Sequence, residues 1–272
     1  MRVIQKAHQA GDRVIALGTF DGVHRGHQTL ISEAKSLAEE LEIPLRICTF
    51  NRHPLEILRP EDPPEMLSTI PEKALAMREL GVDEMELIPF SRKTADLEPE
   101  EFLERLRSML KLRAVVAGWN YSFGKMGRGN AELLKEDGER HGYRVLIVPP
   151  TTLADGTVIS SSLIRKTLRE GQILKAAELL GRDYTVTGTV TRCKGFDKVS
   201  GTAVCGFTPW IRKALPRNGK YLCRMETGSE TCTAEICIEI KEGNETELLI
   251  PDGFSRITGR KIRLTPMSQS RE

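Results

Sequence analysis

The 272-residue chain lacks several features that would place it in a specialised class of protein. It contains no CxxC pair, which disfavours a structural zinc site, and no apolar run near the roughly 18 residues of a membrane helix. Its 40 Lys and Arg against 38 Asp and Glu leave a formal charge of +2, which argues against a dedicated nucleic-acid or membrane surface. The first residues, MRVIQKAHQAGD, lack the apolar core of a signal peptide, so a cytoplasmic location is expected.

The six cysteines are concentrated toward one end of the chain, with five of them after residue 190. A disulfide framework is disfavoured in a reducing compartment. Buried or half-buried thiols in a β-rich region are therefore expected at Cys193, Cys205, Cys223, Cys232 and Cys237.

Before residue 183, short apolar runs alternate with amphipathic helical stretches. The strand-like runs are 13–18, 45–50, 85–90, 113–118 and 144–149. Repeated strand–helix–strand order with near-continuous apolar strands predicts an α/β domain over residues 1–183, built on a doubly wound parallel sheet. Ligands of such sheets bind beyond the carboxyl ends of the strands.

After residue 183 the helical period disappears. YTVTGTVTR alternates between apolar and polar residues, and TCTAEICIEIK does the same, which is typical of half-buried strands. Glycines punctuate these runs at turn spacing. Residues 184–272 are therefore expected to form a small antiparallel domain, a β-barrel.

The stretch GTFDGVHRGH, residues 18–27, follows the first predicted strand and precedes the first predicted helix. Backbone N–H groups and the positive end of a helix dipole favour a phosphate at such a place. Two imidazoles three residues apart, His24 and His27, would donate hydrogen bonds to charge that develops on that phosphate. The alternative is a glycine-rich turn with two solvent-facing histidines.

The stretch resembles the HxGH signature of the nucleotidylyltransferase superfamily, in the form found in bacterial FAD synthetases. TFNRHP (49–54) resembles the TFxPHP segment of that family, and VVAGWNYSFGKMGRGN (115–130) resembles VVGxDFxFGxxRxGd. LSTIPEKALAMRELGVDEMELIPF (67–90) and ISSSLIRKTLREGQILKAAELLGRDYTVTGTV (159–190) resemble two further segments. Together these motifs run almost without interruption from residue 13 to residue 190.

The resemblance implies a Rossmann-like nucleotidylyltransferase domain that joins ATP and FMN into FAD, with Mg²⁺ accompanying ATP and no resident metal site. It assigns catalytic roles to His24, His27, Ser161 and Arg165. It assigns ATP contacts to Gly18, Phe20, Asp21, Gly26 and Ser162. It assigns FMN contacts to His53, Pro54, Asn120, Phe123 and Arg128. For Phe123, packing of its loop onto the domain is an equally good explanation.

The resemblance weakens after residue 190. A riboflavin kinase module of this family should carry GxxxGRxLGFPTAN, where Thr and Asn help to hold metal and nucleotide. Here the stretch reads TRCKGFDKVSGTAVCGFTPWI: Thr208 and Pro209 occur in reversed order and no asparagine follows. The later landmark LPxxGVYxV survives as LPRNGKYLCRM. We therefore expect a degenerate kinase-like barrel without riboflavin kinase activity.

Other functions stay open at this stage. They are a bifunctional kinase and adenylyltransferase, a non-catalytic flavin-sensing protein, and nucleotidyl transfer to a different phosphate acceptor. The expected partners are ATP and FMN, without a membrane or nucleic acid, and nothing in the sequence specifies an oligomeric state. Because the transfer motifs precede residue 183, deletion of residues 190–272 is expected to leave adenylyl transfer largely intact, provided that the truncated protein stays soluble.

Overall fold

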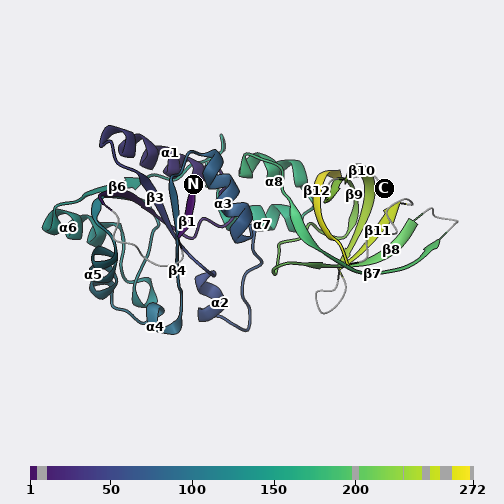
Figure 1. Cartoon of the computed structure of the whole chain (residues 1–272), viewed down its shortest axis with the longest axis horizontal. Helices are drawn as coiled ribbons and strands as arrows, with labels where there is room; N and C mark the ends of the chain where they lie inside the picture. The colour runs from purple at the N-terminus through teal and green to yellow at the C-terminus, as the bar shows by residue number, and fades with distance from the viewer. Residues whose placement is uncertain (5–10, 198–201, 229, 241–245, 252–258, 270–272) are drawn as a thin grey trace. The chain divides into compact units, whose positions relative to one another are not determined.

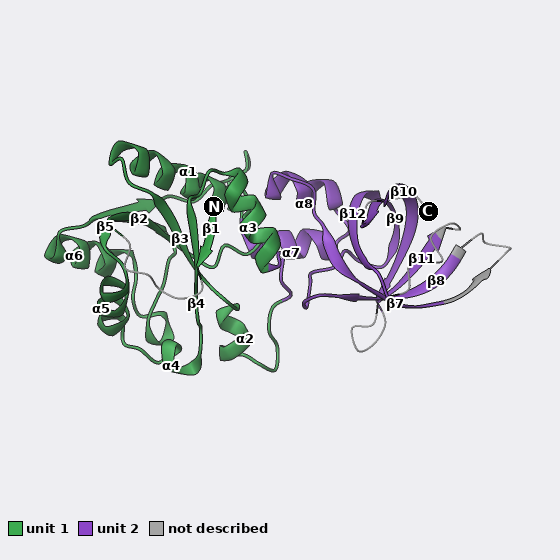
Figure 2. Cartoon of the chain, in the orientation of Figure 1, with its two compact units in different colours: residues 1–64, 70–159 green, residues 65–69, 160–272 purple. Residues whose placement is uncertain are grey.

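The computed structural model contains a parallel sheet unit and a barrel unit (Figure 1). It describes residues 1–4, 11–197, 202–228, 230–240, 246–251 and 259–269. The first unit comprises residues 1–64 and 70–159, and the second comprises residues 65–69 and 160–272 (Figure 2). The predicted change at residue 183 concerns secondary structure: the last helix ends at Leu180, and the first barrel strand begins at Val186.

The first unit is built on a parallel six-stranded sheet in the order β1-β4-β3-β2-β5-β6. Its strands are β1 (Arg2–Ile4), β2 (Arg13–Leu17), β3 (Leu45–Phe50), β4 (Glu84–Ile88), β5 (Leu112–Gly118) and β6 (Arg144–Val148). The five predicted strands are confirmed. Strand β1 was not predicted, because three residues are too short for a hydrophobic pattern.

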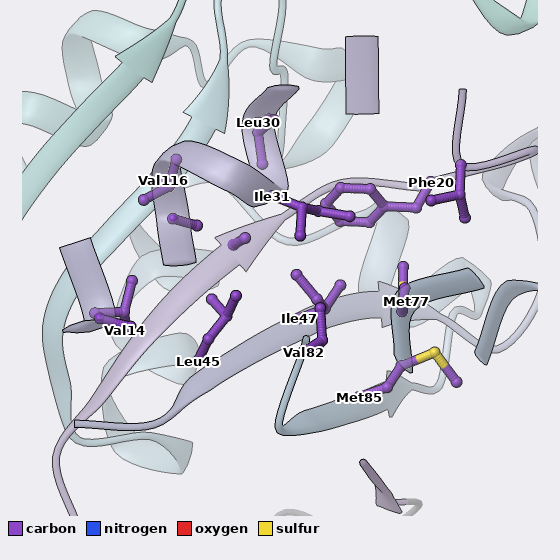
Figure 3. Packing of buried hydrophobic residues seen from close by; sticks show 14 of the residues in the cluster. Val14, Phe20, Leu30, Ile31, Leu45, Ile47, Met77, Val82, Met85 and Val116 are labelled. Carbon is purple, nitrogen blue, oxygen red and sulfur yellow. The ribbon is translucent and has the colours of Figure 1, made fainter. Parts of the chain in front are cut away.

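Helices pack on both faces of this sheet, as expected for a doubly wound fold. They are α1 (Arg25–Glu40), α2 (Pro54–Leu58), α3 (Ile70–Glu79), α4 (Arg92–Ala95), α5 (Pro99–Met109) and α6 (Ala131–His141), with a 3₁₀ turn η1 (Lys125–Gly127). Successive residues of β2 point to opposite faces: Val14 packs with α1 and α3, and Ile15 packs with α5 and α6. Figure 3 shows the first of these clusters, which also contains Phe20 from the loop after β2.

A buried ion network crosses three strands of the sheet. Arg46 of β3 is 1% exposed, and its guanidinium contacts Glu84 at 2.7 Å and Glu86 at 2.8 Å. Arg13 of β2 donates to Glu84 at 3.0 Å. Although burial raises the pKa of Glu84, the hydrogen bonds from Arg13 and Arg46 hold it below its ordinary value. Burial raises the pKa of Glu86, and the attraction of Arg46 offsets this only in part.

The second unit is a closed antiparallel barrel in the order β10-β11-β8-β7-β12-β9, which confirms the predicted fold. Its strands are β7 (Val186–Asp197), β8 (Thr202–Pro209), β9 (Gly219–Thr227), β10 (Glu230–Ile240), β11 (Thr246–Pro251) and β12 (Lys261–Gln269). Alternation fills the interior: Tyr221, Cys223 and Met225 of β9 are fully buried. Closure removes free sheet edges.

Two helices, α7 (Ser161–Arg169) and α8 (Ile173–Leu180), belong to the barrel unit. The amide of Arg217 donates to the Leu168 carbonyl at 3.2 Å, and α8 packs on β12. The Tyr184 hydroxyl donates to the Ala214 carbonyl at 2.5 Å. A chain that ends at residue 189 loses these partners, so α7 and α8 are expected to be less stable in it, and the effect of such a truncation on adenylyl transfer stays a prediction.

The expectation of thiols is wrong for two of the cysteines. Cys193 of β7 lies opposite Cys205 of β8, and the two form a disulfide with Cα atoms 4.0 Å apart. Strand pairing brings them together across a sequence separation of 12, which no short motif reveals. The thiols in the described residues are Cys48, Cys223, Cys232 and Cys237.

The disulfide predicts how many cysteine thiols react before and after reduction of the protein. In denaturant without reductant, we expect four reactive thiols, and after reduction all six cysteines. Alkylation followed by peptide mass spectrometry should place the protected pair at Cys193 and Cys205. Six reactive thiols in the unreduced protein, purified without reductant, would contradict the pairing.

Candidate active site

The loop of residues 18–27 joins the carboxyl end of β2 to the start of α1, where the sequence predicts a phosphate site. Gly18 directly follows the strand, and its amide donates to the Cys48 carbonyl at 3.3 Å. Phe20 is buried in the sheet core (Figure 3), and Asp21 is 1% exposed. The loop is therefore fixed by the sheet unit and lies at the edge where such folds bind ligands.

The loop backbone is strained. Phe20 and Val23 adopt positive φ angles of 49° and 42°, which non-glycine residues rarely do, and Gly22 between them has φ 82°. Each such non-glycine residue costs on the order of 1–3 kcal/mol and persists only where its surroundings determine it. Full burial of Phe20 and Val23 supplies that determination. Strain of this kind is typical of functional sites.

The two histidines of the loop lie face to face. Their rings are stacked with centroids 3.7 Å apart and an interplanar angle of 21°. His24 is the N-cap of α1, and its Nδ1 accepts from the His27 amide at 3.4 Å. Because Nδ1 accepts, a neutral His24 carries its proton on Nε2 and is a donor there. A Cβ at Gly26 would lie 3.2 Å from the His24 ring, so glycine leaves room for this stacking.

The carbonyl of Thr19 in the same loop accepts two hydrogen bonds that sequence reasoning missed. The Lys73 ammonium, from the first turn of α3, donates at 2.6 Å, and the Thr49 hydroxyl at the end of β3 donates at 3.0 Å. Lys73 lies within the segment 67–90 that resembles the family, but its role there could not be read from spacing. Its partner is a backbone oxygen 54 residues away.

The residues expected to contact FMN lie on two loops of the sheet unit. His53 caps α2 and its Nδ1 accepts from the Leu55 amide at 3.2 Å, while Pro54 is the first residue of that helix. Asn120 is exposed just after β5. Phe123 is 5% exposed and packs on Phe102 with centroids 5.4 Å apart, which favours loop packing over ligand contact.

Arg128, the fifth of these residues, is exposed in the loop after β5. It forms an ion pair with Glu98 at 3.5 Å, and Lys125 pairs with the same carboxylate at 3.1 Å. A phosphate contact from Arg128 therefore competes with Glu98. The role of Arg128 stays a prediction.

Ser161, Ser162 and Arg165 lie on α7 in the second unit and are described with it. The N-cap of α7 is Ser160, whose hydroxyl accepts from the Leu163 amide at 3.2 Å. Ser161 and Ser162 are thus the first two residues of the helix, one and two positions beyond the cap. Arg165 is largely buried, and its Nε donates to the Glu65 carbonyl at 2.5 Å.

Two kinds of feature are absent from the described residues. No group of three or more His, Cys, Asp or Glu side chains among them is arranged to hold a metal ion. None of the helices in the described parts of the chain is both long and apolar enough to cross a membrane.

Comparison with known families decides which kind of protein carries this loop. Residues 6–163 match the family described as FAD synthetase. The chain belongs to the FAD synthetase family. All the candidate residues lie in the matched range except Arg165, which follows it by two positions.

Relatives in the FAD synthetase family extend over most of the chain. The bifunctional riboflavin kinase/FMN adenylyltransferase of Listeria monocytogenes is 33% identical over 81% of this chain and 70% of its own. The protein of the same name from Bacillus subtilis is 30% identical over 80% and 68%. A solved structure from Streptococcus pneumoniae, titled macrolide-efflux protein, covers all of this chain and 92% of its own with a TM-score of 0.86 at 27% identity. The fold of both units is thus found together in another protein.

Proposed function

We propose that this chain transfers the AMP moiety of ATP to FMN, giving FAD and pyrophosphate. The observation that carries the proposal is the stacked His24 and His27 pair, held at the N-terminus of α1 in a strained, buried loop beyond β2. Membership of the FAD synthetase family supports the choice of acceptor.

The chemistry asks for positioning and charge neutralisation more than for a covalent nucleophile. An oxygen of the FMN phosphate attacks the α-phosphorus of ATP in line, and the bond from that phosphorus to the bridging oxygen of pyrophosphate breaks. His24, as an Nε2 donor, and His27 stabilise the charge that develops on the α-phosphate, together with the amides at the start of α1.

Other groups are proposed to neutralise the remaining phosphate charges and to bind the two substrates. Mg²⁺ is proposed to arrive with ATP and to offset the charge of its phosphates. Arg165 is proposed to meet the leaving pyrophosphate, and Ser161 and Ser162 to contact ATP from the first turn of α7. On the acceptor side, exposed Asn120 after β5 is the proposed contact of the flavin, with His53 and Pro54 after β3 as further proposed contacts. The cytoplasmic location stays a prediction from sequence.

We further propose that the barrel does not phosphorylate riboflavin. After Thr208 and Pro209 the chain continues with Trp210, not the Ala-Asn of the kinase signature. The indole of Trp210 donates to the Thr189 hydroxyl at 3.2 Å, and the Lys261 ammonium lies 5.3 Å from its ring centroid. The place after Thr208 and Pro209 is thus taken by an aromatic residue with its own contacts on the barrel.

One pair of assays tests both proposals. We expect purified protein with FMN and Mg·ATP to form FAD and pyrophosphate, followed by chromatography. With riboflavin and Mg·ATP, after long incubation, we expect no FMN or FAD above an enzyme-free blank. FMN from riboflavin would establish the bifunctional alternative. Binding of flavin without either product would favour the flavin-sensing alternative.

A further inference from the structure

A buried ammonium group beneath the histidine loop has no role in the chemistry described so far. Lys73 is 5% exposed and lies in the first turn of α3. Burial opposes its charge, and the positive end of the helix dipole opposes it again. The buried position of Lys73 beside the loop is therefore explained by the contacts that its ammonium group makes there.

Those contacts are made to the loop. The Lys73 ammonium donates to the Thr19 carbonyl at 2.6 Å, directly before the strained residues Phe20 to Val23. Of the described ionisable groups, Asp21 is the one whose charge acts on Lys73, and it raises the pKa of the ammonium. Lys73 thus donates a hydrogen bond to a backbone oxygen on one side of Phe20 and is attracted by the charge of Asp21 on the other side.

The same helix packs against the base of the loop. Met77, one turn after Lys73, lies in the core cluster that contains Phe20 (Figure 3). The Phe20 side chain and the Thr19 carbonyl therefore both have partners on the α3 side of the sheet. The hydrogen bond from Lys73 to the Thr19 carbonyl therefore helps to stabilise the positive φ angles of Phe20 and Val23.

We propose that Lys73 is a positioning residue for adenylyl transfer, which keeps His24 and His27 in their active arrangement by holding the Thr19 carbonyl. The inference rests on the proposed function. Lys73 acts through the loop and need not touch a substrate. A displacement of about 1 Å at the histidines is enough to cost a large part of the rate.

The test compares Lys73→Met, which keeps the length of the side chain without its charge or donors, with Lys73→Arg and Thr49→Val. We expect Lys73→Met to lower kcat for FAD formation about tenfold with KM for ATP and FMN changed less than about twofold. Lys73→Arg should recover part of the rate. Thr49→Val removes the second donor to Thr19 and should act non-additively with Lys73→Met. Lys135→Met, on an exposed lysine of α6, is the matched control.

A pH profile separates positioning from a general loss of structure. Burial lowers the pKa of Lys73 to about 8, against the opposing effect of Asp21. The charged form holds Thr19 more strongly than the neutral amine, so kcat of the natural protein should fall as pH rises through about 8. Lys73→Arg stays charged and should not show that fall.

A readout without catalysis keeps the test independent of the proposed function. The chain has five histidines, so their ring signals are resolvable by NMR. Lys73→Met should shift the signals of His24 and His27 and leave those of His53 and His141 in place. Unchanged signals for His24 and His27 would overturn the role of Lys73. If Lys73→Met shifts these signals but the natural protein forms no FAD, the contact between Lys73 and the loop is supported and the proposed adenylyltransferase activity is rejected.

Discussion

His27→Ala is expected to lower FAD formation by about a hundredfold or more while the fold is retained. Loss of one preorganised donor to developing charge typically costs a factor of about 10²–10³ in rate. His27 is half-buried, and its ring is stacked on that of His24. The ring centroids of His27 and Phe20 lie 5.2 Å apart. The measurement is steady-state kinetics with FMN and Mg·ATP, with thermal unfolding as the check on folding.

The companion residue needs a different substitution, because His24 also caps α1. His24→Ala removes both the cap and the donor, whereas Asn at this position caps a helix well and lacks the imidazole. We expect His24→Asn to keep the unfolding temperature close to that of the natural protein and still lose most of the activity. His141→Asn, on the last residue of α6, is the control histidine. Normal turnover in both His27→Ala and His24→Asn would reject the assigned chemistry.

The sheet could be predicted because its central strands are buried on both faces and so are near-continuous apolar runs, as in 113–118. The histidine pair could be predicted because its geometry is local: a cap and a residue three positions later share one helix start. Three consecutive serines mark a helix start as well. They do not fix which serine is the cap, and the structure selects Ser160.

Features that depend on distant partners could not be predicted. Lys73 sits in an amphipathic helix, where a lysine is ordinarily solvent-facing, and its burial depends on the loop 54 residues earlier. Phe123 lies in a glycine-rich loop that suits a ligand, and only its packing on Phe102 identifies it as core. Arg165 was expected at a phosphate, and its bond to the Glu65 carbonyl links α7 to a segment that sequence patterns left unassigned.

The ion network in the sheet is the clearest example of a feature that could not be predicted from the sequence. Arg46 interrupts an apolar strand, and its partners Glu84 and Glu86 follow 38 and 40 residues later. Three charges in two strands would ordinarily indicate exposed faces, yet all three side chains are at least nine-tenths buried. Parallel pairing of β3 with β4 sets them opposite one another, so each charge is matched only after the sheet has formed.

Arg46→Met is therefore expected to destabilise the sheet unit by about 3–5 kcal/mol at pH 7. Removal of Arg46 leaves the carboxylates of Glu84 and Glu86 buried without their main counter-charge. A buried charge without its partner destabilises the folded state more than nonpolar residues at the same positions would. Urea unfolding can follow this unit by the fluorescence of Trp119, one of two tryptophans, in a Trp210→Phe background. Arg144→Met breaks an exposed ion pair with Glu40 in the same unit and should cost less than about 1 kcal/mol.

The pH dependence of the Arg46→Met variant has a definite sign. Without the Arg46 guanidinium, burial and repulsion from Glu84 place the folded-state pKa of Glu86 above that of the unfolded chain, whereas Glu84 keeps its hydrogen bond from Arg13. The folded variant then binds more protons than the unfolded one, so its stability rises as pH falls from 7 toward 5 and its deficit against the natural protein narrows. Adding Glu84→Gln and Glu86→Gln to Arg46→Met removes the unpaired charges and should recover most of the loss at pH 7. A deficit that stays constant with pH, and that the triple variant does not repair, would mean that Arg46 stabilises the sheet by packing and not by charge.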